Sequence, residues 1–82
     1  MEVDEINLKR IYFPHIVLRD ARKAKEMTQQ QAADGCGVTL RQYQRLESGE
    51  RDIAATSFKV ALTLCGLLDI EPHDLLNGIT EK

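Results

Sequence analysis

Two helix-start signals lie close together in the stretch MTQQQAADGCGVTLRQYQRLESGE, residues 27–50. They are the pairs Thr28–Gln31 and Thr39–Gln42. A threonine followed three residues later by glutamine forms a capping box, in which the hydroxyl accepts from a backbone amide and the glutamine side chain reaches back. The two signals predict short helices over about 28–36 and about 40–48. This spacing restricts the fold more than any other feature of the chain.

A glycine-containing turn separates the two predicted helices, with the sequence GCGV at residues 35–38. Gly35 or Gly37 can take the left-handed conformation that ends a helix, and Val38 can fill the turn. Two adjacent alanines before the turn form a stripe of small side chains that lets another helix approach closely. Two helices joined by a turn of three or four residues that contains glycine form a helix-turn-helix.

Apolar residues at helical spacing predict three further helices and no substantial β-sheet. One covers about 14–25 and starts at Pro14, where a missing N–H costs nothing. Another covers about 57–68, after a loop with the sequence ERDIAAT, and the last opens at Pro72. We expect the apolar side chains of the last two helices to be buried: Phe58, Ala61, Leu62, Leu64, Cys65, Leu68, Leu75 and Leu76.

The chain is short enough for one domain around a single core. Its 82 residues divide into an N-terminal arm over 1–13, a helical domain over 14–78 and a C-terminal tail over 79–82. The arm sequence INLKRIYF fits a short strand or a helix, but we expect an extended arm whose Ile11, Tyr12 and Phe13 pack on the body or on a second subunit. Because so small a core contributes only about 3–5 kcal/mol net, we expect dimerisation to add stability.

The composition excludes several classes of protein. The two cysteines are too few for a framework of spaced disulfides, so we interpret both as reduced, apolar core residues. The N-terminus is acidic where a signal peptide would be basic, and no apolar run is long enough to span a bilayer. No phosphate loop, metal site or catalytic triad is recognisable. We therefore expect a soluble cytoplasmic protein that is no enzyme and uses no cofactor or metal.

The net charge of the whole chain is −2, which argues against a nucleic-acid partner. The distribution of charge along the chain weakens that objection. Residues 9–51 carry nine Lys or Arg against five Asp or Glu. The flanking segments 1–8 and 52–82 each carry three more acidic than basic residues. Because the local field steers a polyanion more than the net charge does, the basic middle segment is compatible with DNA binding.

The segment from Met27 to Arg51 closely resembles the helix-turn-helix of the Cro/C1-type repressors of phages and bacteria, the XRE-like family. The matching positions are Met27, Thr28, Gln29, Ala32, Ala33, Gly37, Val38, Thr39, Arg45, Leu46, Glu47 and Gly49. The resemblance extends over about 17–77. It implies an all-α, five-helix lambda-repressor-like DNA-binding domain with a short N-terminal extension. The chain departs from the family at Asp69, where relatives often have glycine.

The second helix of the motif presents polar side chains on its outer face. Its outward positions are Leu40, Arg41, Gln44 and Arg45. Arg41 and Arg45 project side by side because they are four residues apart, and the arginine fork fits O6 and N7 of guanine. Leu40 can only contact a thymine methyl group. We expect these four residues to read DNA bases, and the resemblance assigns that role to the first, second and sixth residues of the helix in particular.

Phosphate contacts are expected around the ends of the motif helices. A helix N-terminus binds anions through its free amides, and in the family a glutamine at the place of Gln29 binds the DNA backbone. The expected phosphate-contacting residues are Thr28, Gln29, Thr39, Gln42 and Arg51. The resemblance also implies a partly buried ion pair between Arg22 and Glu47.

Two functions of different classes are consistent with this pattern. The first is a sequence-specific transcriptional regulator that binds a near-palindromic operator in double-stranded DNA as a homodimer. The second is an interaction module, such as the antitoxin of a toxin–antitoxin pair, which holds a protein partner and for which DNA binding is secondary. A third, a helical domain that has lost DNA binding, would not need to keep exposed polar side chains at Arg41, Gln44 and Arg45.

Overall fold

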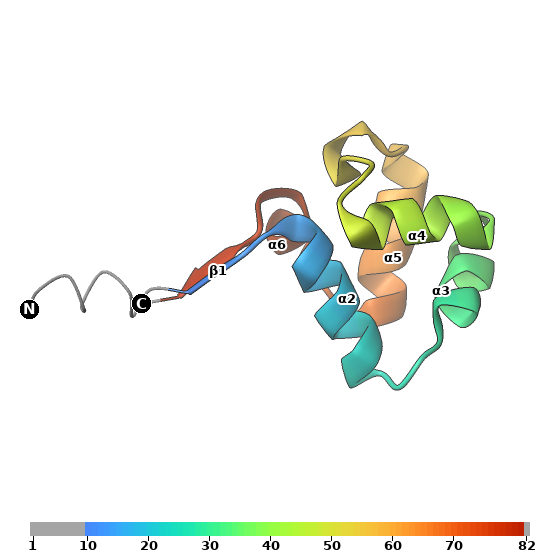
Figure 1. Ribbon diagram of the computed structural model, residues 1–82, viewed down its shortest axis with the longest axis horizontal. Coiled ribbons are helices and arrows are strands. Elements are labelled where there is room, and N and C mark those ends of the chain that lie inside the picture. The colour runs from blue at the N-terminus through green and yellow to red at the C-terminus, as the bar shows by residue number, and fades with distance from the viewer. Residues whose placement is uncertain (1–9, 82) are drawn as a thin grey trace, which may run out of the picture.

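Five α-helices form the body of the protein, and the structure, a computed structural model, describes residues 10–81. The helices are α2 (Pro14–Ala24), α3 (Gln29–Cys36), α4 (Leu40–Ser48), α5 (Phe58–Leu68) and α6 (Pro72–Asn77). α3 packs against α4 and α5, and α2 packs against α4 and α6. Figure 1 shows α5 running between α2 and α3. The predicted all-α, five-helix fold is confirmed.

Both predicted capping boxes form in the helix-turn-helix. Thr28 Oγ1 accepts from the backbone N–H of Gln31 at 3.0 Å, and Gln31 Oε1 accepts from the backbone N–H of Thr28 at 2.8 Å. Thr39 and Gln42 make the same exchange at 3.1 and 2.9 Å. Gly37 takes the left-handed conformation with φ 76°, so the second glycine of the turn ends α3.

The end of α5 explains the departure from the family at Asp69. This residue caps α5 in the left-handed conformation, with φ 55° and ψ 46°. Glycine adopts that conformation without cost, and aspartate is among the residues that tolerate it best. The Asp69 carboxylate also contacts Lys25 Nζ at the end of α2, which gives the side chain a partner that glycine would lack.

The core is apolar and draws on every helix. Its buried residues are Val17, Leu18, Ala32, Ala33, Tyr43, Leu46, Ile53, Leu64, Cys65, Leu68, Ile70 and Leu75. The expected burial is wrong for Phe58, Leu62 and Leu76, whose exposed fractions are 77, 45 and 54%. The buried residues of α5 lie in its second half. In its first turn Val60 packs partly against the core, whereas Phe58 points to solvent.

The segment expected to be a loop before α5 contains a short 3₁₀ helix, η1 (Ile53–Ala55). Asp52 starts this helix by accepting from the backbone N–H of Ala54 at 3.0 Å. The turn buries Ile53, and η1 packs against α6. Ile53 therefore belongs to the core, although it follows a charged stretch of the sequence.

Two short strands pair at the ends of the described chain. β1 (Arg10–Tyr12) runs antiparallel to β2 (Ile79–Glu81), with Ile11 opposite Thr80. The ribbon agrees with the strand that the arm sequence left open, and it pairs the arm with the first residues of the predicted C-terminal tail. Figure 1 shows the ribbon projecting away from the helices.

The N-terminal arm packs on the body through one of its three apolar side chains. Tyr12 contacts the core, whereas Ile11 and Phe13 are largely exposed. Successive side chains of a strand point to opposite faces, so the three cannot all turn inward. Packing of Ile11 and Phe13 on the body is therefore a wrong expectation, and their contact with a second subunit stays a prediction. The rest of the predicted arm, residues 1–9, lies outside the described residues.

Candidate nucleic-acid interface

α4 presents a polar outer face because its buried side chains point into the core. Arg41 and Gln44 are exposed. Arg45 is half-buried, and its Nε lies 3.6 Å from Glu50 Oε2 in an ion pair. The side chains of Arg41, Gln44, Arg45 and Glu50 line a shallow groove of about 260 Å³. Leu40, at the first position of α4, is half-buried and lies outside this groove.

The N-terminus of α3 presents free backbone amides. Its capping box uses the amides of Thr28 and Gln31, and the first amides of a helix have no partner within the helix. The amides of Gln29 and Gln30 therefore point out of the helix end, where the positive end of the helix dipole favours an anion. Thr39 caps α4 in the same way. Three of the expected phosphate-contacting residues, Thr28, Thr39 and Gln42, thus have a capping role.

Gln42 and Arg51 lie beside the start of α5. Together with Arg45 and Ser57 they line a groove of about 280 Å³. Arg51 Nη2 donates to the Ala55 carbonyl oxygen at 3.1 Å, which holds the guanidinium at this place. Ser57 caps the N-terminus of α5. The free amides of that helix end therefore lie next to Gln42 and Arg51, two of the expected phosphate contacts.

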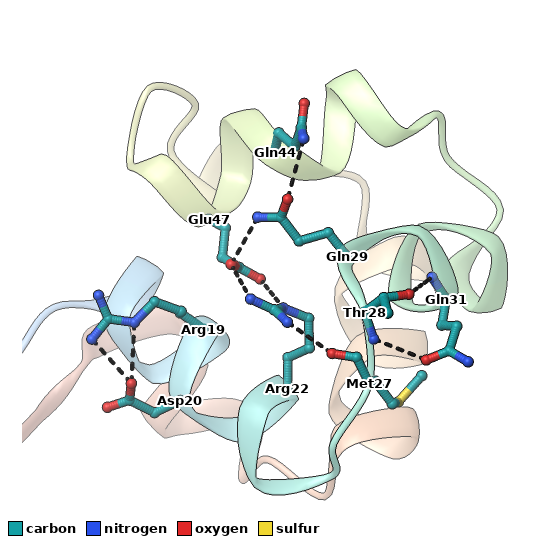
Figure 2. A network of polar contacts seen from close by, with 9 residues as sticks. All are labelled: Arg19, Asp20, Arg22, Met27, Thr28, Gln29, Gln31, Gln44 and Glu47. Carbon is teal, nitrogen blue, oxygen red and sulfur yellow. Dashed lines mark hydrogen bonds and ion pairs between the residues drawn. The ribbon is translucent and has the colours of Figure 1, made fainter.

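A bidentate ion pair joins α2 to α4. Arg22 Nε donates to Glu47 Oε2 at 2.7 Å, and Arg22 Nη2 donates to Glu47 Oε1 at 2.9 Å. Arg22 Nη1 also donates to the Met27 carbonyl oxygen at 2.7 Å. The Arg22 and Glu47 side chains are 11 and 5% exposed, against 42 and 50% for the surface pair Arg19–Asp20. Figure 2 shows both pairs.

These contacts keep the buried pair charged. Burial alone would raise the pKa of Glu47, but hydrogen bonds from Arg22 and Gln29 outweigh it and hold the pKa below its ordinary value of 4.5. The hydrogen bond with Glu47 raises the pKa of Arg22. Burial, and then the neighbouring Glu47, raise the pKa of Tyr43. The Tyr43 hydroxyl lies beside the pair without meeting the geometry of a hydrogen bond to any residue in the described part of the chain.

Two glutamines connect α3 to α4 above the ion pair. Gln29 Nε2 donates to Glu47 Oε1 at 3.0 Å, and Gln44 Nε2 donates to Gln29 Oε1 at 3.2 Å. Figure 2 shows the Gln29 side chain lying between the two helices. Gln29 and Gln44 are 15 positions apart, and no local spacing in the sequence links them. Sequence patterns therefore give no sign of this contact, nor of the Arg45–Glu50 pair.

The described residues offer few other sites. No three His, Cys, Asp or Glu side chains among residues 10–81 lie close enough to hold a metal ion. None of the helices in that part of the chain is both long and apolar enough to cross a membrane. Cys36 and Cys65 carry free thiols, and burial raises the pKa of both.

Known proteins place this arrangement in a family. A family model described as helix-turn-helix matches residues 18–75, more than half of the chain. The chain is also 34% identical over 61 residues to a Bacillus subtilis (strain 168) protein named as an uncharacterized HTH-type transcriptional regulator, YqaE. That match covers 74% of this chain but 50% of the relative, so the chain spans about half of the relative's length. No solved structure matches the chain significantly. The capped helix pair, its glycine turn and the matched family model together show that the protein belongs to the XRE-like helix-turn-helix family.

Proposed function

We propose that the protein is a DNA-binding transcriptional regulator of the Cro/C1 type that places α4 in the major groove. The observation that carries this proposal is the exposed pair Arg41 and Gln44 on a helix that lies beside the open N-termini of α3 and α5. An α-helix fits the major groove, and amide and guanidinium donors on either side match the phosphates that border it. The name of the relative as a transcriptional regulator supports the same function.

Four residues of α4 read bases in this proposal. Arg41 and Arg45 donate to guanine, Gln44 contacts a base edge beside them, and Leu40 packs against a thymine methyl group. The Arg45–Glu50 pair is weak enough to exchange for a base contact, because both side chains are substantially exposed. Leu40 is half-buried, so only part of its side chain is free for this role.

Phosphates meet the protein on both sides of α4. Thr28 and Gln29 offer the N-terminus of α3, and Thr39 offers the N-terminus of α4. Gln42 and Arg51 contact the second phosphate row from the groove beside α5. These contacts set the position of the protein on the duplex and carry no sequence information.

We infer that the DNA-binding form is a homodimer. Phe58, Leu62 and Leu76 expose apolar surface around a groove of about 310 Å³ between η1, α5 and α6. In a two-fold dimer the same patch meets itself, so each copy can insert its exposed phenyl ring into the groove of the other. Two copies of α4 then face two half-sites of a palindromic operator.

Selection of bound sequences from a random pool of double-stranded DNA, at one stated salt concentration, tests this function. The expected product is an inverted repeat whose half-sites are about 10 base pairs apart, or a multiple of that. Recovery of a single half-site would overturn the dimer. Recovery of no preferred sequence, even at about 50 mM salt where backbone contacts are strong, would overturn sequence-specific binding.

The same apolar groove also favours the second function, an interaction module of the antitoxin kind. A protein partner that inserted an apolar side chain there would compete with the second copy of this chain. In that case the purified protein stays monomeric and selects no operator alone, but selects one when the partner is present.

A further inference from the structure

A chain of hydrogen bonds leads from the buried Glu47 carboxylate to the exposed Gln44 amide. The first bond joins Gln29 Nε2 to Glu47 Oε1 at 3.0 Å, and the second joins Gln44 Nε2 to Gln29 Oε1 at 3.2 Å. Glu47 is 5% exposed and fixed by two bonds from Arg22. The inner end of the chain is therefore rigid, and its outer end lies on the face of α4 that is proposed to meet DNA.

The chemistry of the three groups sets the direction of every bond. An ionised carboxylate only accepts, so the Gln29 atom that faces Glu47 is the NH₂ group. The oxygen of Gln29 then faces α4, and it also only accepts. The Gln44 atom that faces Gln29 is therefore NH₂ as well. One buried charge thus fixes the orientation of two successive amides.

This orientation leaves a defined pair of groups on the Gln44 amide for a ligand. Figure 2 shows Gln44 Oε1 directed away from Gln29. The second N–H of the same amide makes no hydrogen bond within residues 10–81. The free groups are one acceptor and one donor, side by side on a planar amide.

Among the major-groove edges, adenine matches that pair best. Its N6–H₂ donates and its N7 accepts, whereas guanine offers two acceptors there. Thymine offers an acceptor and a methyl group, and cytosine offers a donor alone. A Gln44 amide with the reverse orientation would present its NH₂ group first and would not distinguish adenine in this way.

We propose that Gln44 reads an adenine, and that Glu47 acts through Gln29 as a positioning residue that turns the Gln44 oxygen toward the base. The proposal rests on the proposed function, since it needs α4 to lie in the major groove. It gives Gln29 a role in specificity in addition to its expected contact with the DNA backbone.

The test uses the operator that the wild-type protein selects, together with versions changed at one base position at a time. Gln44→Ala identifies the position: its preference for adenine should fall about 5- to 150-fold, the contribution of a bidentate base contact. Gln29→Met keeps the side-chain length but removes both hydrogen bonds. It should lower the adenine preference at that same position by about two- to tenfold, because Gln44 must then be ordered on binding.

Gln30→Met is the matched control. Gln30 is the next residue of α3, and its amide donates to Asp34 at 2.9 Å on the same helix, away from Glu47. This variant should leave the adenine preference unchanged. In the double variant Gln29→Met, Gln44→Ala, the change at position 29 should have no further effect on that preference, because the residue it orients is gone.

Glu47→Gln tests the inner end of the chain at a temperature where circular dichroism shows the variant folded. Glu47 Oε1 accepts from both Arg22 Nη2 and Gln29 Nε2, so the amide of this variant keeps its oxygen at that place and turns its NH₂ group toward Arg22 Nε. The hydrogen bond to Gln29 then has a neutral acceptor in place of a charged one, which weakens it. The adenine preference should fall by less than in Gln29→Met, because Gln29 keeps its orientation but has a weaker anchor; an unchanged preference in both variants would overturn the positioning role.

The outcomes separate this inference from the proposed function. If the wild-type protein selects no operator, the proposed function fails. If it selects one and Gln29→Met weakens all sequences equally with the adenine preference intact, Gln29 is a backbone contact only and the positioning role is wrong. An operator without an adenine that responds to Gln44→Ala would overturn the assignment of the base.

Discussion

At the scale of single residues, the stability of the fold depends on Arg22 and Glu47 being present together. Both side chains are almost fully buried, and each is the other's main charged partner. Such a pair adds little net stability over a well-packed apolar pair, but losing one partner leaves a buried charge that nothing compensates. The surface pair Arg19–Asp20 has no such dependence, because water solvates either charge alone.

Arg22→Met should therefore lower the free energy of unfolding by about 3–5 kcal/mol. Arg19→Met, which breaks the exposed pair on the same helix, should change it by less than about 1 kcal/mol. Urea unfolding followed by circular dichroism measures both. Equal and small losses in the two variants would contradict the role given to the buried pair.

The pH dependence of stability should report Glu47. Its folded-state pKa is lowered, so the unfolded chain binds the proton more readily and stability falls as the pH falls. The contribution is fully present above the ordinary pKa of 4.5 and is lost as the pH falls through the lowered value. Urea unfolding of the wild type and of Glu47→Gln between about pH 7 and about pH 3, which covers the acid titration of carboxylates, checks this. The stability difference between them should be constant above the window and shrink within it; a constant difference throughout would refute the linkage.

Arg41→Ala should weaken binding to the selected operator by about 1–3 kcal/mol and relax the preference at one base position. Fluorescence anisotropy with the operator and with random DNA measures the two effects. Arg51→Ala should instead weaken all sequences alike and reduce the slope of log K against log salt by about 1. An equal loss for Arg41→Ala on every sequence would make Arg41 a phosphate contact.

At the scale of elements, helix starts were predictable because their causes are local. Each capping box involves residues only three positions apart, so it marks the start of α3 or α4 locally. Pro14 and Pro72 begin α2 and α6 as expected. η1 and the ribbon of β1 and β2 were not predictable in this way. Ile53 is buried where η1 packs against α6, and the strands pair across almost the whole chain.

Two glycines should respond oppositely to alanine. Gly37 ends α3 with φ 76°, and an added Cβ would meet no atom within 4 Å, so only backbone strain opposes it. Gly37→Ala should cost about 1 kcal/mol or more. Gly66 lies inside α5 with equal space around it, and Gly66→Ala should add about 0.5–1 kcal/mol through helix propensity. Thermal unfolding of the two variants should therefore shift in opposite directions, and a shift in the same direction would refute this account.

At the scale of the whole molecule, the sequence revealed the residues of the site better than their contacts. The outward positions of α4 follow from helical period, since the same period that buries Tyr43 and Leu46 exposes Arg41 and Gln44. The bonds that tie Gln29 to α4 depend on how α3 packs, which no pattern in either helix encodes. For the same reason an apolar residue such as Phe58 reads as core in the sequence and stands on the surface of the single chain.

The position of Phe58 makes the proposed dimer testable without loss of the fold. Phe58→Glu replaces a side chain that is 77% exposed, so the monomer should remain folded. It should weaken dimerisation about 30-fold or more, as the loss of a central aromatic contact does. Ile11→Glu, on the exposed face of β1, tests the alternative interface at the N-terminal arm and should weaken the dimer less; sedimentation equilibrium measures both. The opposite result would move the interface to the N-terminal arm.

The ribbon has a practical consequence for work with this protein. β1 and β2 bring residues from opposite ends of the chain to one place, and Figure 1 shows that place on the far side of the helices from α3 and α4. A fluorophore or affinity tag joined next to either strand would therefore leave from the same pole. In the proposed complex with DNA, such a label would lie away from α3 and α4 and would not obstruct the duplex.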